Sequence, residues 1–114
     1  MAILSLHKEN AEKQLEQFCE KRVPPHARRQ IKISFKKRGD TLTLYECRSV
    51  FYDPTQWTEM PVAQIRYKKD EATWFLFRPT RNEKWFPYDD LHMTKNFADI
   101  IKELETDPSG TFWG

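Results

Sequence analysis

Residues 31–47 constrain the fold more than any other part of the chain, because hydrophobic and polar residues alternate on both sides of Gly39-Asp40. Alternation with a period of two is typical of a β-strand with one buried face, and Gly-Asp between two such runs predicts a tight hairpin turn. A three-residue loop would mix the two faces, so we expect a loop of two or four residues. The buried face then carries Ile33, Phe35, Leu42 and Leu44. The opposite face carries Lys32, Ser34, Lys36, Thr43, Tyr45 and Cys47.

Amphipathic helices are predicted on either side of the strands. The first covers residues 5–22, with Ser5 as its N-cap and with Pro24 and Pro25 unable to continue it. Its apolar positions at helical spacing are Ala11, Leu15, Phe18 and Cys19. The second covers residues 94–107, with Thr94 as its cap. Its apolar positions are Phe97, Ile100, Ile101 and Leu104. Each helix has one apolar stripe and therefore needs a surface to cover.

Three further short strands are predicted at residues 62–68, 73–78 and 84–88, and residues 52–61 are predicted to be irregular between two prolines. The run Thr-Trp-Phe-Leu-Phe at 73–77 is apolar on both faces, so either both faces are covered or one presents an aromatic platform. The order helix, five strands, helix predicts an α+β fold. We expect one mostly antiparallel sheet in a meander with both helices packed on it, in a single domain over residues 1–114.

A basic segment at residues 21–38 contains eight Lys and Arg residues and no Asp or Glu, although the net charge of the whole chain is only +2. Lysines and arginines along a strand, with an aromatic residue among them, are typical of proteins that hold the phosphates and bases of single strands. The alternative is a solvated sheet face whose lysines discourage edge-to-edge pairing. The sequence leaves both interpretations open. The predicted nucleic-acid-binding residues are Arg28, Arg29, Lys32, Lys36, Lys37, Arg38 and Tyr45.

Sixteen aromatic residues are more than the inner face of one small sheet needs, so we expect most of those between 74 and 88 in the core and some in an exposed patch. The C-terminal residues Phe112 and Trp113 are unexpected at a chain end, where residues normally fray. They are predicted either to dock on their own chain or to bind a protein partner or a second copy. This makes a protein-interaction module the alternative to nucleic-acid binding.

The histidine, cysteine and acidic residues form no sequence pattern typical of a catalytic or metal-binding site. His7, His26 and His92 lie on separate segments, and only His92 has carboxylates nearby, at Asp89 and Asp90, where a connector is the expected role. With two cysteines and three glycines, the chain has neither a four-cysteine zinc motif nor a glycine-rich phosphate loop. We therefore expect a binding module rather than an enzyme, with no cofactor, no metal and no membrane contact, and a reducing cytoplasmic setting.

Four segments together resemble a family of small bacterial proteins of unknown function. They are VPPHARRQIKISFKKRGDTLTLYECR, PVAQIRYKKDEATWFLF, YDDL and the ending DPSGTFWG, within a similarity that covers residues 18–114. The family is similar in its basic hairpin flanked by prolines, its A-x-x-R-Y strand and its DP-[ST]-G-x-FWG ending. The resemblance implies a bacterial source and one compact domain, and it implies no catalytic residues. The expected function is therefore that of a non-catalytic module that binds single-stranded DNA or RNA, or another polyanion.

Overall fold

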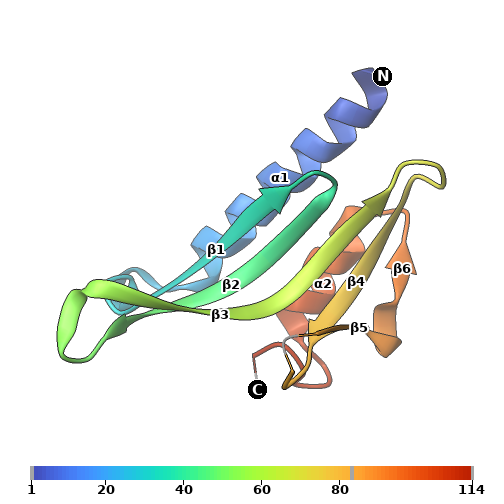
Figure 1. The fold of residues 1–114 in the computed structure, drawn as a ribbon. Helices are drawn as coiled ribbons and strands as arrows, with labels where there is room; N and C mark the ends of the chain where they lie inside the picture. The colour runs from blue at the N-terminus through green and yellow to red at the C-terminus, as the bar shows by residue number, and fades with distance from the viewer. Residues whose placement is uncertain (1, 83, 114) are drawn as a thin grey trace.

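The computed structural model describes the backbone of residues 2–82 and 84–113, and the side chains in those ranges from residue 9 onward. A long helix precedes the strands and a shorter one follows them (Figure 1). The elements are α1 (Ala2–Arg22), η1 (Pro25–Ala27), β1 (Ile31–Arg38), β2 (Thr41–Val50), β3 (Asp53–Lys68), β4 (Thr73–Pro79), β5 (Trp85–Pro87), η2 (Asp89–Leu91), β6 (Met93–Thr94) and α2 (Phe97–Thr106). The predicted α+β order is confirmed.

The strands form one antiparallel sheet in the order β1-β2-β3-β4-β5, with β6 also pairing with β4. The predicted meander is therefore confirmed. The first hairpin has the expected even loop, because Arg38 pairs with Thr41 across Gly39-Asp40 and Phe35 pairs with Leu44. Gly39 adopts a φ of +59°, which glycine tolerates better than residues with a Cβ atom.

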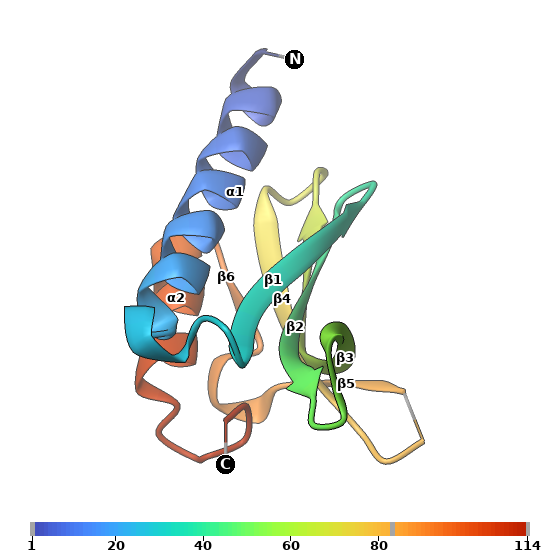
Figure 2. The same ribbon diagram turned by 90° about the vertical axis from the view of Figure 1, so that its left-hand side faces the viewer.

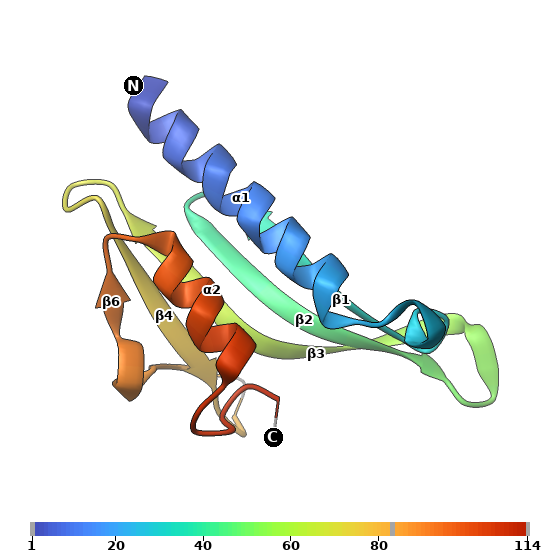
Figure 3. The same ribbon diagram turned by 180° about the vertical axis from the view of Figure 1, so that it is seen from behind.

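Both helices cover the same face of the sheet, and the other face is free of helices (Figure 2). Helix α1 lies along β1 and β2, and α2 lies over the other half of the sheet (Figure 3). The core between these layers contains Leu15 and Phe18 from α1 and Ile100 and Leu104 from α2. The inner face of the sheet contributes Ile33, Leu42, Leu44, Ile65, Trp74 and Leu76. Because the helices share one face, neither of them covers the cationic and aromatic side chains on the other face.

Several predicted details were wrong. Residues 53–61 are not irregular, since they form the first half of β3 and pair with β2 through two register shifts that absorb the irregular spacing. Helix α1 begins at Ala2, so Ser5 lies inside it. Helix α2 is capped by Asn96, whose side chain accepts a hydrogen bond from the Ala98 amide, rather than by Thr94. Strand β6 was not predicted, because two residues carry too little periodicity to be recognised.

The aromatic residues between 74 and 88 are less buried than predicted. Trp74 and Tyr88 belong to the core, whereas Phe75, Phe77 and Trp85 are partly buried and Phe86 is exposed. The double-sided run in β4 explains the difference. Its even-numbered residues Trp74 and Leu76 face the helices, and its odd-numbered residues Phe75 and Phe77 face away from them. Of the two alternatives for this run, the aromatic platform is the one present.

The C-terminal tail docks on its own chain. Asp107 ends α2 in a left-handed conformation, and its carboxylate accepts hydrogen bonds from the backbone amides of Phe112 at 3.1 Å and Trp113 at 2.9 Å. The Phe112 ring is buried against Tyr88, with ring centroids 4.8 Å apart. The Trp113 indole donates a hydrogen bond to the carbonyl of Leu104 at 2.7 Å. The docked conformation was one of the two predicted alternatives.

Candidate functional site

The open face, which we define as the side of the sheet away from both helices, gathers cations and aromatic rings from β1, β2, β3 and β4. Strand register puts these side chains there, because residues that pair directly across an antiparallel sheet point to the same side. The pairs Lys36↔Thr43, Thr43↔Gln64 and Gln64↔Phe77 trace this side across four strands. On these four strands its cations are Lys32, Lys36, Arg38, Arg66 and Lys68, and its aromatic residues are Tyr45, Trp57, Phe75 and Phe77. Trp85 of β5 pairs with Pro79 and lies on the same side.

Each of the four aromatic rings on β2, β3 and β4 lies under a cationic group. The ammonium group of Lys32 lies 4.4 Å from the centroid of the Trp57 ring, and that of Lys36 lies 4.8 Å from the centroid of Tyr45. On the other half of the face, the guanidinium group of Arg66 is 4.0 Å from the Phe77 centroid. The ammonium group of Lys68 is 5.9 Å from the Phe75 centroid. These pairs hold the long cationic side chains close to the sheet instead of letting them extend into solvent.

A shallow hollow of about 740 Å³ lies in the middle of the open face. It is lined by Lys36, Arg38, Thr41, Thr43, Tyr45, Gln64 and Arg66. Hydrogen bonds fix its floor, because the Gln64 amide donates to Thr43 Oγ1 at 3.1 Å and accepts from Arg66 Nε at 2.7 Å. The hollow therefore offers hydrogen-bonding groups, one aromatic ring and three positive charges, and no acid lines it.

Two carboxylates pair with cations of the open face, since Glu71 lies 3.8 Å from the ammonium group of Lys68 and Glu59 pairs with Lys36. Glu59 forms an ion pair with Lys36 at 2.9 Å, and both side chains are largely exposed. The hydrogen bond from Lys36 to Glu59 raises the pKa of the lysine above its usual value, because the bond favours the ammonium form. The pair is screened by water and is easily exchanged for another anionic partner.

Four of the seven residues predicted to bind nucleic acid lie together on the open face, namely Lys32, Lys36, Arg38 and Tyr45. Lys37 points to the opposite side and forms an ion pair with Glu12 of α1 at 3.3 Å. Strand alternation places Lys37 on the side of the sheet opposite to Lys32 and Lys36. Arg28 and Arg29 precede β1, where Arg28 donates to the Glu20 carbonyl at 3.4 Å. Arg29 lines a hollow near the tip of the β2–β3 hairpin.

On β3 and β4, five residues of the open face were missed by the sequence argument. They are Trp57, Arg66, Lys68, Phe75 and Phe77. A signal for Arg66 and Lys68 was present, since they alternate with Ile65 and Tyr67 in a predicted strand. What the alternation could not show is that this strand lies beside β2 in the register that aligns both sets of cations. Trp57 was missed because its segment was predicted to be irregular.

Two buried groups have strongly raised pKa values. Burial raises the pKa of the Cys19 thiol to about 12, with the nearby Glu16 carboxylate adding to the shift. Burial also raises the pKa of the Tyr88 hydroxyl to about 12. That hydroxyl donates to Glu103 Oε1 at 2.9 Å and lies 3.2 Å from Ser109 Oγ. Both groups lie among core and tail residues rather than on the open face, and we assign them a structural role.

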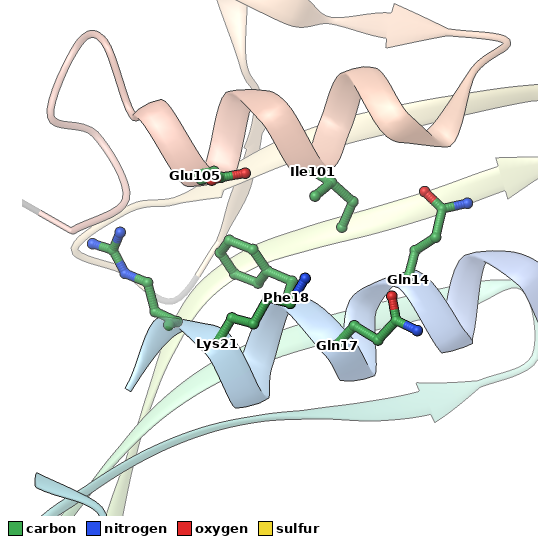
Figure 4. Close-up of a pocket in the computed structure, with 7 residues that line it drawn as sticks. Gln14, Gln17, Phe18, Lys21, Ile101 and Glu105 are labelled. Carbon is green, nitrogen blue, oxygen red and sulfur yellow. The ribbon is translucent and has the colours of Figure 1, made fainter. Parts of the chain in front are cut away.

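The other hollows and side-chain clusters offer fewer groups that could bind or react with a ligand. Between α1 and α2, a groove of about 390 Å³ is lined by the side chains in Figure 4, which include Gln14, Gln17, Lys21 and Glu105. His92 packs edge-on against Phe75, and the side chain of His7 lies outside the described residues. Within the described residues, His, Cys, Asp and Glu side chains nowhere gather in threes or more in a way that could hold a metal ion. Among the helices described, none is long and apolar enough to cross a membrane.

Comparison with known proteins gives one match. The family model described as "Domain of unknown function (DUF3024)" matches residues 4–114, almost the whole chain. Neither the curated proteins nor the solved structures contain a match to this chain. Functional inference therefore depends on the chemistry of the molecule itself.

Proposed function

Since the chain belongs to the DUF3024 family, a domain of unknown function, we propose its function from its surface: the protein binds single-stranded nucleic acid, DNA or RNA, through the open face. The observation that carries this proposal is the pairing of four aromatic rings, which β2, β3 and β4 place on that face, with a Lys or Arg side chain. Rings and cations arranged in this way supply stacking surfaces for bases and charges for phosphates.

The energies favour an exchange of partners when a strand binds. A cation over an aromatic ring at an exposed site contributes about 0.5–1 kcal/mol, whereas a base stacked on such a ring contributes about 1–3 kcal/mol. A base that displaces Lys36 from Tyr45 would therefore gain more than is lost. The displaced ammonium group remains beside the strand, where it can bind a phosphate. The same exchange applies to Arg66 over Phe77.

Specificity for single strands follows from the same geometry. Bases must leave a duplex before their faces can lie flat on Tyr45, Trp57 or Phe77. A double-stranded nucleic acid could therefore contact only the cations of this face. No base-specific pattern of donors and acceptors is evident beyond Gln64 and Thr43. We expect binding that tolerates many sequences and weakens with salt by about 0.7 log units per log unit for each phosphate contact. A cytoplasmic setting accompanies this proposal, since both cysteines are free and buried.

Charge reversal at Arg66 tests the proposed face. The test measures fluorescence polarisation of a labelled oligonucleotide at several salt concentrations, with wild type, Arg66→Glu and the matched control Lys102→Glu. Lys102 is exposed on α2, so this control makes the same change in net charge away from the open face. We expect Arg66→Glu to weaken binding at least about tenfold, which is about 1.4 kcal/mol, and to reduce the salt slope. Equal losses in the two variants, or no binding by wild type at low salt, would contradict the proposal.

Glu59→Gln should strengthen binding of the oligonucleotide, whereas Arg66→Glu should weaken it. This carboxylate repels phosphates and competes for Lys36, so its neutralisation should tighten binding. A gain of about three- to tenfold at low salt is expected for the removal of one like charge near the strand. Unchanged affinity would show that the bound nucleic acid does not approach this part of β3. We do not propose partner binding for Phe112 and Trp113, because their rings pack within their own chain.

A further inference from the structure

The tip of the β2–β3 hairpin carries the two most exposed large hydrophobic side chains among the described residues. Val50 pairs with Asp53, and the two residues between them are Phe51 and Tyr52, which are 98% and 85% exposed. In Figure 1 this turn is the green loop at the left-hand end of the sheet, and in Figure 3 it extends past the end of α1. The tip therefore projects from the body of the protein with two unpartnered rings.

The turn itself gives no reason for aromatic residues. Two-residue hairpin turns favour Gly, Asn and Asp, and neither Phe51 nor Tyr52 adopts a positive φ. Their rings contribute nothing to the core, and their exposure to water is unfavourable. Where a local rule of this kind is broken without a gain in folding, function is the expected reason.

Hydrogen bonds order the part of the hairpin that carries the tip. The carboxylate of Asp53 accepts hydrogen bonds from the backbone amide and the hydroxyl of Thr55, at 3.1 and 2.6 Å. The hydroxyl of Thr58 donates to the Arg48 carbonyl across the hairpin at 3.3 Å, and the Ser49 amide donates to the Gln30 carbonyl at 2.9 Å. Pre-ordering of this kind lowers the entropic cost of binding.

Charges beside the tip indicate what the rings contact. Phe51 lines a hollow of about 480 Å³ together with Arg29 and Arg48, a volume within the range of small-ligand pockets. Both arginines are exposed, and Arg48 shares an ion pair at 2.7 Å with Glu46. Phe51 therefore shares one hollow with two guanidinium groups, and Arg48 reaches it from the side of the sheet that Ile31 faces. Guanidinium groups match phosphates, which a purely apolar protein partner would not supply.

The tip also lies at the end of the open face. Trp57, whose ring lies under Lys32, pairs with Ser49, one residue before Val50 on β2. The distance from Tyr45 to Phe51 along β2 is six residues, or about 20 Å at the usual rise of a strand. A nucleic acid bound on the open face and several nucleotides longer would reach the tip, and it would pass round the tip to meet Arg48, which pairs with Ile31 and points to the other side of the sheet.

We propose that Phe51 and Tyr52 form an outer base-stacking subsite for the same single-stranded nucleic acid, with Arg29 and Arg48 binding the adjoining phosphates. This inference rests on the proposed function of the open face. The subsite also gives Arg29, which lies away from the open face, a role in binding phosphates. It also predicts that affinity depends on strand length, because only longer strands occupy both parts.

A length series separates the subsite from the open face. Affinities of oligothymidylates from about four to about sixteen nucleotides, the range of known site sizes, are measured for wild type and for the double variant Phe51→Ser with Tyr52→Ser. The matched control is Phe86→Ser, an exposed ring on β5 at the other end of the sheet. Unchanged circular dichroism and thermal midpoint would show that each variant folds.

The expected result is a loss confined to long strands. Wild type and Phe86→Ser should gain about tenfold or more in affinity once strands reach the tip, and the double variant should lack this gain. A gain that persists in the double variant, or its absence in wild type, overturns the subsite but leaves the open face intact if short strands bind. Absence of binding at every length overturns both. A double variant that instead loses binding to phosphatidylserine vesicles, or loses self-association, with an unchanged length profile would assign the tip to a membrane or a second copy and overturn the subsite.

Discussion

Asp107 connects α2 to the C-terminal tail, and its replacement by alanine should destabilise the protein. The residue has two separate functions in the structure. Its backbone is left-handed, with a φ of +40°, and its own amide donates to the Glu103 carbonyl at 2.8 Å. Its carboxylate accepts the amides of Phe112 and Trp113, and so places one ring against Tyr88 and the other against α2.

The size of the expected loss in stability follows from these two roles of Asp107. Hydrogen bonds to a charged group contribute about 1.5–3 kcal/mol each when buried, and a half-buried carboxylate shared by two donors falls near the lower limit. A non-glycine residue without a polar side chain loses about 1 kcal/mol more in the left-handed region. We therefore expect Asp107→Ala to reduce the free energy of unfolding by about 2–4 kcal/mol, a large part of the 5–15 kcal/mol typical of a domain.

Urea unfolding, followed by tryptophan fluorescence and by circular dichroism, measures this loss, and two further variants separate its causes. Asp107→Asn keeps one acceptor oxygen and tolerance of the left-handed region, so its loss should be about 1 kcal/mol. Asp107→Gly removes the acceptor but relieves the backbone, so its loss should lie between those of Asn and Ala. Glu105→Ala, an exposed position on α2, should change stability by less than about 0.5 kcal/mol. A loss below that level for Asp107→Ala, or equal losses for Asn and Ala, would refute the reasoning.

Three further predictions concern the core, the first hairpin and alkaline pH. Leu76→Ala should reduce the free energy of unfolding by about 2–5 kcal/mol in urea titrations, because Leu76 is fully buried between the sheet and the helices. Gly39→Ala should reduce the thermal midpoint by an amount equivalent to about 1–2 kcal/mol, from its positive φ alone, since no atom lies within 4 Å of the added Cβ. The free energy of unfolding should fall as pH rises from about 9 to about 12. The folded state keeps the protons of Cys19 and Tyr88, whereas the unfolded chain releases them near pH 9.0 and 10.0. Tyr88→Phe should make the free energy of unfolding depend less on pH in urea titrations at several pH values.

Part of the candidate site could be predicted from the sequence because it lies within one hairpin. Lys32, Lys36, Arg38 and Tyr45 share a face as a consequence of strand alternation and an even turn, both of which are local properties. The same alternation directs Lys37, which was predicted as a binding residue at the turn, toward Glu12 on α1.

The rest of the site could not be predicted, because it depends on strand neighbours and on the placement of the helices. Arg66 and Phe77 meet the basic hairpin only because β3 pairs with β2 through a register shift between Leu44 and Tyr45. A shift of one residue in the other direction would have turned these side chains toward the helices. The aromatic tip was missed for another reason, since Phe51 and Tyr52 contradict the usual composition of turns.

The sequence by itself determined the α+β class, the two amphipathic helices, the even turn at Gly39-Asp40 and the one-sided charge of the first hairpin. All of these depend on residues close together along the chain, where periodicity and turn chemistry are decisive. Only the tertiary structure decided that both helices cover one face and leave the other open (Figure 2). The same contacts decided that the rings of β3 and β4 join that face and that the tail docks in cis. An amphipathic stripe specifies that it must be buried but not against which surface, so the face that remains free for binding is a property of the assembled fold.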